Sequence, residues 1–178
     1  MDKKDAVPVI PAVIVPKRLG DYLEVMTRAV FQAGVTWKQI AEHWGAYRRA
    51  FVDFHCERVA AFTDADIERA LMEPGLLRSE KKMQATVHNA RTLCAINSEW
   101  GSKEASDVTG FQKYLRSFPD YHTLAKNFHK RFKFMGEMNV WYVLFRTGEA
   151  VPEFESWVPT IKGDHPRMRE MVEQAHIR

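Results

Sequence analysis

Apolar residues recur at steps of three and four along most of the chain, which is the period of amphipathic α-helices. The clearest stripe runs through residues 19–33, and Gly34 follows its last turn, where glycine commonly ends a helix. Thr36 is a suitable N-cap for the next helix. No stretch of four or more residues alternates as a strand does, so the pattern predicts an all-α fold. The remaining helices are expected over residues 37–44, 47–54, 57–62, 64–71, 80–97, 111–118 and 166–176.

Residues 124–148 predict a helix, a very short basic turn and a second helix. The second helix, over residues 137–147, is apolar on nearly every face, so it should be buried. Its free N–H groups and positive dipole end would lie beside the basic turn, which suits a phosphate group. The alternative is a helical corner with solvated lysines. The predicted phosphate contacts are Lys130, Arg131, Lys133, Phe134, Met135 and Gly136.

The composition indicates a folded, mildly basic protein. The chain has 178 residues, of which 46% are hydrophobic and 12% aromatic. This suits a single domain with a real core and excludes a disordered tail. The net charge of +3 is compatible with a nucleic-acid partner without requiring one. The two cysteines, Cys56 and Cys94, form no metal-spaced pair, which is typical of buried thiols in a reducing compartment.

An apolar run over residues 6–15 is the main candidate for a targeting or membrane segment. Pro8 and Pro11 interrupt it and Pro16 follows it, and proline breaks the helix that a signal peptide or membrane span needs. No other stretch approaches the ~18 apolar residues of a span. We therefore expect an extended arm over residues 1–18 and a soluble, cytoplasmic protein without a membrane partner.

Three stretches of the chain match one known family in order and spacing. The first comprises residues 31–37 (FQAGVTW) and 47–51 (YRRAF), and the second residues 75–91, which begin GLLR. The third comprises residues 132–136 (FKFMG), with Tyr142 and Gly148 after them. Over residues 19–150 the chain is similar to the type I DNA-3-methyladenine glycosylases, which belong to the helix-hairpin-helix glycosylase superfamily.

The resemblance implies a fold and an activity. It implies a helical glycosylase-like domain over residues 19–150, with the helix-hairpin-helix at 124–148 and residues 151–178 packed on the same domain. It also implies a monomer, without a cofactor, that hydrolyses the N-glycosidic bond of an alkylated purine in double-stranded DNA. Such an enzyme extrudes the base into a pocket, and a side chain fills the gap in the helix.

The resemblance also assigns site residues. Gln32, Gly34 and Val35 belong to the wedge loop, with Val35 where the family has leucine. Trp37 becomes a wall of the base pocket. The alternative for Trp37 is a core tryptophan on an amphipathic helix.

The chain departs from the family at two functional positions. Ala29 stands where the family has its base-reading glutamate, so hydrogen-bond discrimination should be weak and no catalytic residue is assigned. Replacement carboxylates are Glu24, Glu153 and Glu155, each of which also fits a surface position. The cysteines of the family's zinc site are missing, and His165 and His176 are too few for a closed site, so we expect no metal. His43, His88 and His129 are not convincing acids or bases.

These departures leave two other functions open. One is a catalytically impaired helix-hairpin-helix protein that binds DNA without excising bases. The other is a helical interaction protein with no DNA role. Salt-dependent duplex binding separates these two alternatives.

Overall fold

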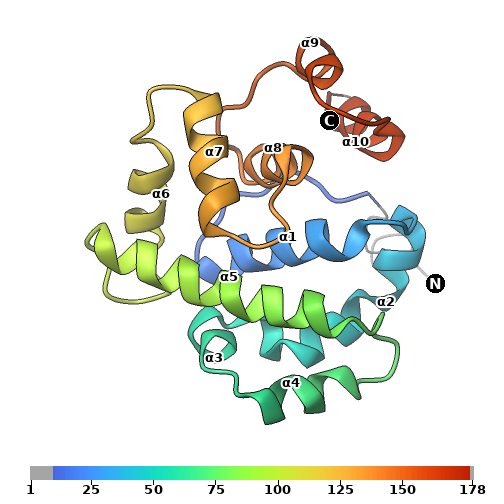
Figure 1. Ribbon diagram of the computed structural model, residues 1–178, viewed down its shortest axis with the longest axis vertical. Coiled ribbons are helices and arrows are strands. Elements are labelled where there is room, and N and C mark those ends of the chain that lie inside the picture. The colour runs from blue at the N-terminus through green and yellow to red at the C-terminus, as the bar shows by residue number, and fades with distance from the viewer. Residues whose placement is uncertain (1–9, 177–178) are drawn as a thin grey trace, which may run out of the picture.

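A computed structural model describes residues 10–176 of the chain (Figure 1). No strand occurs in this part, which confirms the predicted all-α fold. None of its helices is long and apolar enough to cross a membrane. The helices are α1 (Leu19–Gln32), α2 (Trp37–Ala50), α3 (Cys56–Ala60), α4 (Asp64–Leu71), α5 (Glu80–Glu99), α6 (Thr109–Leu115), α7 (Tyr121–Arg131), α8 (Glu137–Arg146), α9 (Phe154–Trp157) and α10 (Pro166–His176), with short 3-10 turns at Val52–Phe54 and Val158–Thr160.

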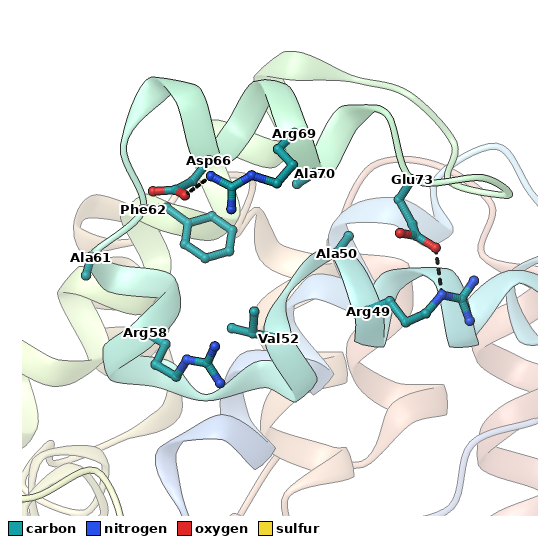
Figure 2. Close-up of a pocket in the computed structure, with 10 residues that line it drawn as sticks. All are labelled: Arg49, Ala50, Val52, Arg58, Ala61, Phe62, Asp66, Arg69, Ala70 and Glu73. Carbon is teal, nitrogen blue, oxygen red and sulfur yellow. Dashed lines mark hydrogen bonds and ion pairs between the residues drawn. The ribbon is translucent and has the colours of Figure 1, made fainter.

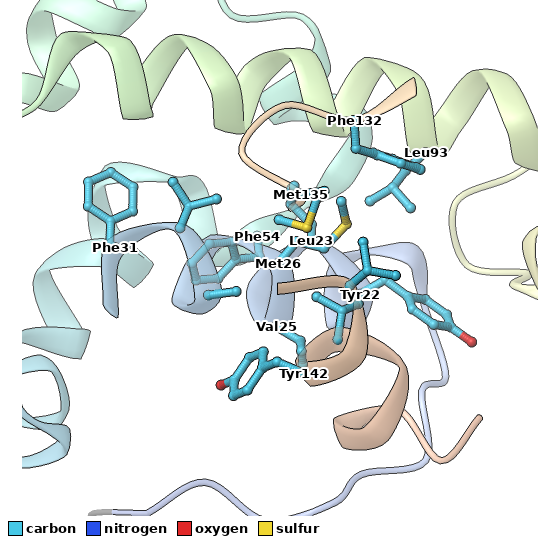
Figure 3. Packing of buried hydrophobic residues seen from close by; sticks show 14 of the residues in the cluster. Tyr22, Leu23, Val25, Met26, Phe31, Phe54, Leu93, Phe132, Met135 and Tyr142 are labelled. Carbon is cyan, nitrogen blue, oxygen red and sulfur yellow. The ribbon is translucent and has the colours of Figure 1, made fainter. Parts of the chain in front are cut away.

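Helix α1 lies in the middle of the molecule, and α2, α5 and α8 pack against it (Figure 1). Burial on several sides explains why even its polar residues Thr27, Arg28 and Gln32 are buried. Hydrophobic burial is the main force that holds such a core together. Figure 3 shows the apolar side chains of α1 among residues from other segments, including Leu93, Phe132, Met135 and Tyr142.

The separate helix predicted over residues 47–54 is wrong. Helix α2 continues to Ala50, and the chain then turns through Val52, Asp53 and Phe54, all of which have positive φ. This turn crosses α1 at Gly20, where an added Cβ would lie 2.2 Å from the Phe54 carbonyl oxygen. The close approach is a tertiary contact, so periodicity within the segment could not predict it.

The predicted helix-hairpin-helix is confirmed, with an earlier start. Helix α7 begins at Tyr121 rather than near 124, because the Asp120 side chain accepts a hydrogen bond from the Thr123 amide and caps the helix. Helix α8 is buried along most of its length, as its apolar pattern predicted. Gly148 ends it with a φ of 73°, a left-handed conformation that glycine adopts without strain.

The two ends of the described chain pack beside α8. The Ile14 amide donates to the Arg146 carbonyl oxygen (2.7 Å), and the Arg146 Nε donates to the Ala12 carbonyl oxygen (2.8 Å). On the other side, Trp157 stacks on Trp141 with ring centroids 5.7 Å apart. Trp157 belongs to α9, and residues of α10 and α8 line one cavity. Residues 1–9 of the predicted arm lie outside the described part.

Candidate functional site

A cavity of about 240 Å³ lies where the end of α1, the start of α2, α8 and the start of α10 meet. Ala29 and Trp37, the positions that the resemblance assigned to the pocket, both line it. Its volume is below the ~300–1,000 Å³ of sites for drug-sized ligands, so it suits a small planar molecule. The other lining residues are Gln32, Ala33, Met138, Asn139, Tyr142, Asp164, His165, Pro166, Arg167 and Met168.

Two aromatic side chains, those of Trp37 and Tyr142, line the cavity. The rings of Trp37 and Tyr142 lie 20° from parallel, with centroids 6.3 Å apart. The Trp37 Nε1 donates to the Arg167 carbonyl oxygen (3.1 Å), which fixes the ring against α10. Trp37 is only 4% exposed, so it belongs to the core and to the cavity wall together. The sequence interpretation did not include Tyr142 in the pocket, because the packing of α8 against α2 is not visible in the sequence.

Gln32, which the resemblance assigned to the wedge loop, has a side chain that is 9% exposed and lines the cavity. The Nε2 donates to the Val35 carbonyl oxygen (2.6 Å), while the Oε1 is buried without a hydrogen-bond partner among the described residues. Of the predicted wedge, Gly34 with a φ of 84° is exposed and Val35 is half-buried.

None of the three predicted replacement carboxylates lines the cavity. Glu24 accepts hydrogen bonds from Trp44 Nε1 (2.7 Å) and Arg48 Nη2 (2.9 Å). Glu155 pairs with Arg169. Glu153 caps α9 by accepting from the amides at its start. These carboxylates therefore have structural roles.

Asp164 is the carboxylate that does line the cavity. It is exposed and lies in the loop before α10, next to His165. The His165 Nε2 donates to the Lys162 carbonyl oxygen (3.0 Å), a contact within the loop. The sequence interpretation missed Asp164 because nothing in a polar loop indicates which core helix it will face.

A buried positive charge lies close to this wall. Arg28 is 7% exposed, and its Nε and Nη2 have no hydrogen-bond partner in the described part of the chain. Its guanidinium carbon lies 4.8 Å from the centre of the Trp44 ring. Burial lowers the pKa of Arg28 from its ordinary value, because the charged form loses its hydration. Arg28 precedes Gln32 by four residues, so the two share one face of α1.

The hairpin turn is held by hydrogen bonds from neighbouring helices. The Lys133 amide donates to Asn89 Oδ1 (2.8 Å), and Asn89 Nδ2 donates to the Lys133 carbonyl oxygen (3.1 Å). The His88 Nε2 donates to the Arg131 carbonyl oxygen (3.0 Å), and the His129 Nδ1 donates to that of Met135 (2.9 Å). These two histidines therefore position the turn.

The predicted phosphate contacts divide into two groups. Lys130 and Lys133 are exposed, and neither has an ion-pair partner among the described residues. Arg131 pairs with Glu99 (3.2 Å), and the Lys133 amide is used by Asn89, so neither group is free for a phosphate. In the described structure the amides of Phe134, Met135 and Gly136 make no hydrogen bond, although the Met135 side chain is buried.

A larger cavity, of about 500 Å³, lies between the end of α2, α3 and α4 (Figure 2). Arg49 and Arg69 on its wall are paired with Glu73 and Asp66. Its one aromatic lining residue is Phe62. A base held by stacking needs flat apolar faces, which the cavity at Trp37 supplies and this one lacks.

The described residues contain no group of three or more side chains that could hold a metal ion. His165 is engaged with Lys162, and the side chain of His176 lies outside the described part. Cys56 and Cys94 are both free thiols, with sulfur atoms 3.6 Å apart. The hydrogen bond between them raises the pKa of Cys56.

The sequence is similar to that of known methyladenine glycosylases. The sequence profile of a family described as methyladenine glycosylase matches residues 19–148. The DNA-3-methyladenine glycosylase of Haemophilus influenzae is 27% identical over 113 residues, which are 59% of this chain and 61% of that protein. DNA-3-methyladenine glycosylase 1 of Escherichia coli is 30% identical over 118 residues, or 59% of this chain and 63% of that protein. The match thus spans less than two thirds of the length of these relatives.

Solved structures give the same result for the fold. A variant of 3-methyladenine DNA glycosylase I from Staphylococcus aureus superposes with a TM-score of 0.62 at 26% identity, covering 81% of this chain and 82% of that one. A second crystal structure of 3-methyladenine DNA glycosylase I has a TM-score of 0.61 at 26% identity, covering 83% and 91%.

Proposed function

The chain belongs to the methyladenine glycosylase family, and from this premise we propose that it hydrolyses the N-glycosidic bond of an alkylated purine in duplex DNA. The observation that carries the proposal is the cavity beside Ala29 and Trp37, which offers a flat aromatic wall to an extruded base. Base-excising enzymes act on a nucleotide taken out of the stack and held in such a pocket.

The chemistry suits a pocket with few charged groups. In hydrolysis the bond between the sugar C1′ and the base nitrogen breaks, and a water oxygen bonds to C1′. An alkylated purine that is already cationic leaves as a neutral base, so it needs little acid catalysis. Binding that favours the transition state then supplies much of the acceleration. Ala29 contributes no charge, and Asp164 at the cavity is the carboxylate available to a developing positive charge.

The duplex would lie across the hairpin and the loop after α1. Lys130, Lys133 and the free amides of the turn would contact phosphates, which positions DNA without reading its sequence. Val35, at the Gly34 turn beside the cavity, would fill the gap left by the extruded base.

Release of free base from methylated duplex under single-turnover conditions tests the activity. Trp37→Ala should slow release about 10- to 100-fold, because stacking a base on an aromatic ring is worth ~1–3 kcal/mol. Ala29→Glu should accelerate it. Trp100→Ala is the matched control, since Trp100 is exposed and packs on Tyr114, outside the cavity. Fast excision that Trp37→Ala leaves unchanged would place the active site elsewhere.

A DNA-binding protein without excision is the second candidate, and Ala29 is the observation that favours it. Duplex titrations over a range of salt concentrations address DNA binding alone. Replacing both Lys130 and Lys133 by alanine should reduce the salt slope by about two, because each lysine neutralises one phosphate. Arg131→Ala should change it less, because Arg131 is paired with Glu99. Binding without base release would favour the second candidate, and the absence of salt-dependent binding would contradict both.

A further inference from the structure

We infer that the Gln32 Oε1 accepts a hydrogen bond from the exocyclic amino group of the bound base, and so selects 6-aminopurines over 6-oxopurines. The inference rests on the proposed function, because it requires that the cavity at Trp37 holds a purine. It assigns to Gln32 a role in base recognition in place of the wedge role expected from the sequence.

The first observation is an unsatisfied acceptor. Nearly all buried polar groups in folded proteins are hydrogen-bonded, and a buried group without a partner costs free energy. The Gln32 Oε1 is buried and unpaired in the described part of the chain, on a residue that lines the cavity. The bond from Nε2 to the Val35 carbonyl oxygen, at 2.6 Å, assigns the donor end of the amide and leaves Oε1 as the acceptor.

Three other buried or half-buried side chains on the wall already make hydrogen bonds, and Asp164 is exposed. The Trp37 Nε1 donates to Arg167, and the Asn139 Nδ2 donates to the Phe134 carbonyl oxygen (2.7 Å). The Tyr142 hydroxyl accepts from Arg146 Nη1 (2.8 Å). Gln32 therefore offers the cavity a buried hydrogen-bonding atom that no neighbour uses.

The chemistry of that atom defines the ligand. Gln32 and Ala29 line the cavity from the end of α1, so a purine stacked on Trp37 can turn an edge towards them. A 6-amino group can donate to the carbonyl oxygen, whereas a 6-oxo group would bring two acceptors together and leave Oε1 unpaired. A site with a buried polar group strongly rejects a ligand that cannot pair with that group. An apolar pocket discriminates much less between ligands that differ only in size. One such mismatch corresponds to about 10- to 100-fold in affinity.

Gln32 also has a structural role that the experiment must separate. Its Nε2 bond and the bond from the Val35 amide to its own carbonyl oxygen (3.1 Å) together hold the turn after α1. A substitution could therefore weaken all binding by loosening the turn. Gln39 supplies a matched control, because its side chain accepts from the Thr36 amide (2.8 Å) in the same loop but does not line the cavity.

The test is calorimetric titration with two free bases, 3-methyladenine and 3-methylhypoxanthine, which differ in the amino or oxo group at position 6. The parent should bind 3-methyladenine about 10- to 100-fold more tightly. Gln32→Met, which keeps the length of the side chain but has no amide, should reduce this ratio to within about threefold. Gln39→Met should leave the ratio at its parent value even if both affinities fall.

The possible outcomes distinguish the role of Gln32 from the proposed function. Equal binding of the two bases by the parent, or an unchanged ratio in Gln32→Met, overturns the role of Gln32 and leaves the proposed function intact. If the parent binds neither base, the cavity is not a purine site and both proposals fail. The loss of the ratio in Gln32→Met alone supports the inference.

Discussion

The hairpin turn and the cavity wall both pack against the central helices, but they differ in whether their polar side chains have hydrogen-bond partners. At the hairpin, Asn89, His88 and His129 bond to the backbone of the turn. At and beside the cavity wall, the buried side chains of Gln32 and Arg28 keep polar atoms without partners in the described structure. The side-chain bonds at the hairpin thus hold the turn in place, whereas the unpaired Gln32 Oε1 on the cavity wall can pair with a ligand.

The contrast has a physical meaning. Buried hydrogen bonds that are fully satisfied hold one geometry, while partly satisfied ones raise the free energy of the folded state. Proteins usually depart from complete satisfaction at functional sites, where a ligand supplies the missing partner. If this explanation is correct, substitutions in the two regions should change stability in opposite directions.

The largest effect is expected at Asn89. Asn89→Ala removes two hydrogen bonds to Lys133 and leaves its amide without a partner, so the free energy of unfolding should fall by about 2–4 kcal/mol. Urea denaturation measures the change. Asn139→Ala is the control, because it removes one exposed bond to Phe134 on the same turn and should cost about 1 kcal/mol or less. Similar losses for the two variants would show that the turn does not depend on Asn89.

An intermediate effect of opposite sign is expected at Arg28. Arg28→Met removes a buried guanidinium that has unpaired nitrogens and keeps a side chain of similar length. The free energy of unfolding should therefore rise by about 1 kcal/mol, and the loss of the guanidinium contact with the Trp44 ring should offset part of this gain. Arg146→Met provides the comparison, because Arg146 is also 7% exposed but bonds to Ala12 and Tyr142. That variant should lose about 2 kcal/mol. A loss of stability in Arg28→Met would contradict a free-energy cost of the unpaired guanidinium.

The sequence predicted the helices better than it predicted the contents of the cavity. Periodicity predicted the long helices, because a buried stripe on α1 or α5 is a local pattern. Capping chemistry also predicted the start of α2, where the Thr36 side chain accepts from the Gln39 amide. These features depend on residues a few positions apart in the chain.

The contents of the cavity depend on contacts between distant segments. The resemblance placed Ala29 and Trp37, and both line the cavity. It matched Tyr142 by spacing without placing it in the pocket, and it gave no sign of Asp164; these residues reach the cavity from α8 and from the loop before α10. The sequence also could not predict that the Gln32 Oε1 lacks a partner, because the residue type alone does not determine which groups its amide will contact. Hydrogen-bond satisfaction is a property of packing, so it has to be determined from the structure.

The smallest effect concerns the cap that begins the hairpin unit. The hydrogen bond from the Thr123 amide lowers the pKa of Asp120, so the ionised cap stabilises the folded state at pH values above ~3.9, the ordinary pKa of aspartate. That contribution is lost as the pH falls through the lowered pKa of the folded state. In Asp120→Asn the cap remains but does not titrate, so the stability difference from the parent should be small near neutral pH and should disappear in acid. Urea denaturation between about pH 2 and 7 measures this difference. The loss in Asn89→Ala, where no charge is removed, should keep its size over the same range, and a pH-independent difference for Asp120→Asn would contradict the assignment of the cap to the ionised carboxylate.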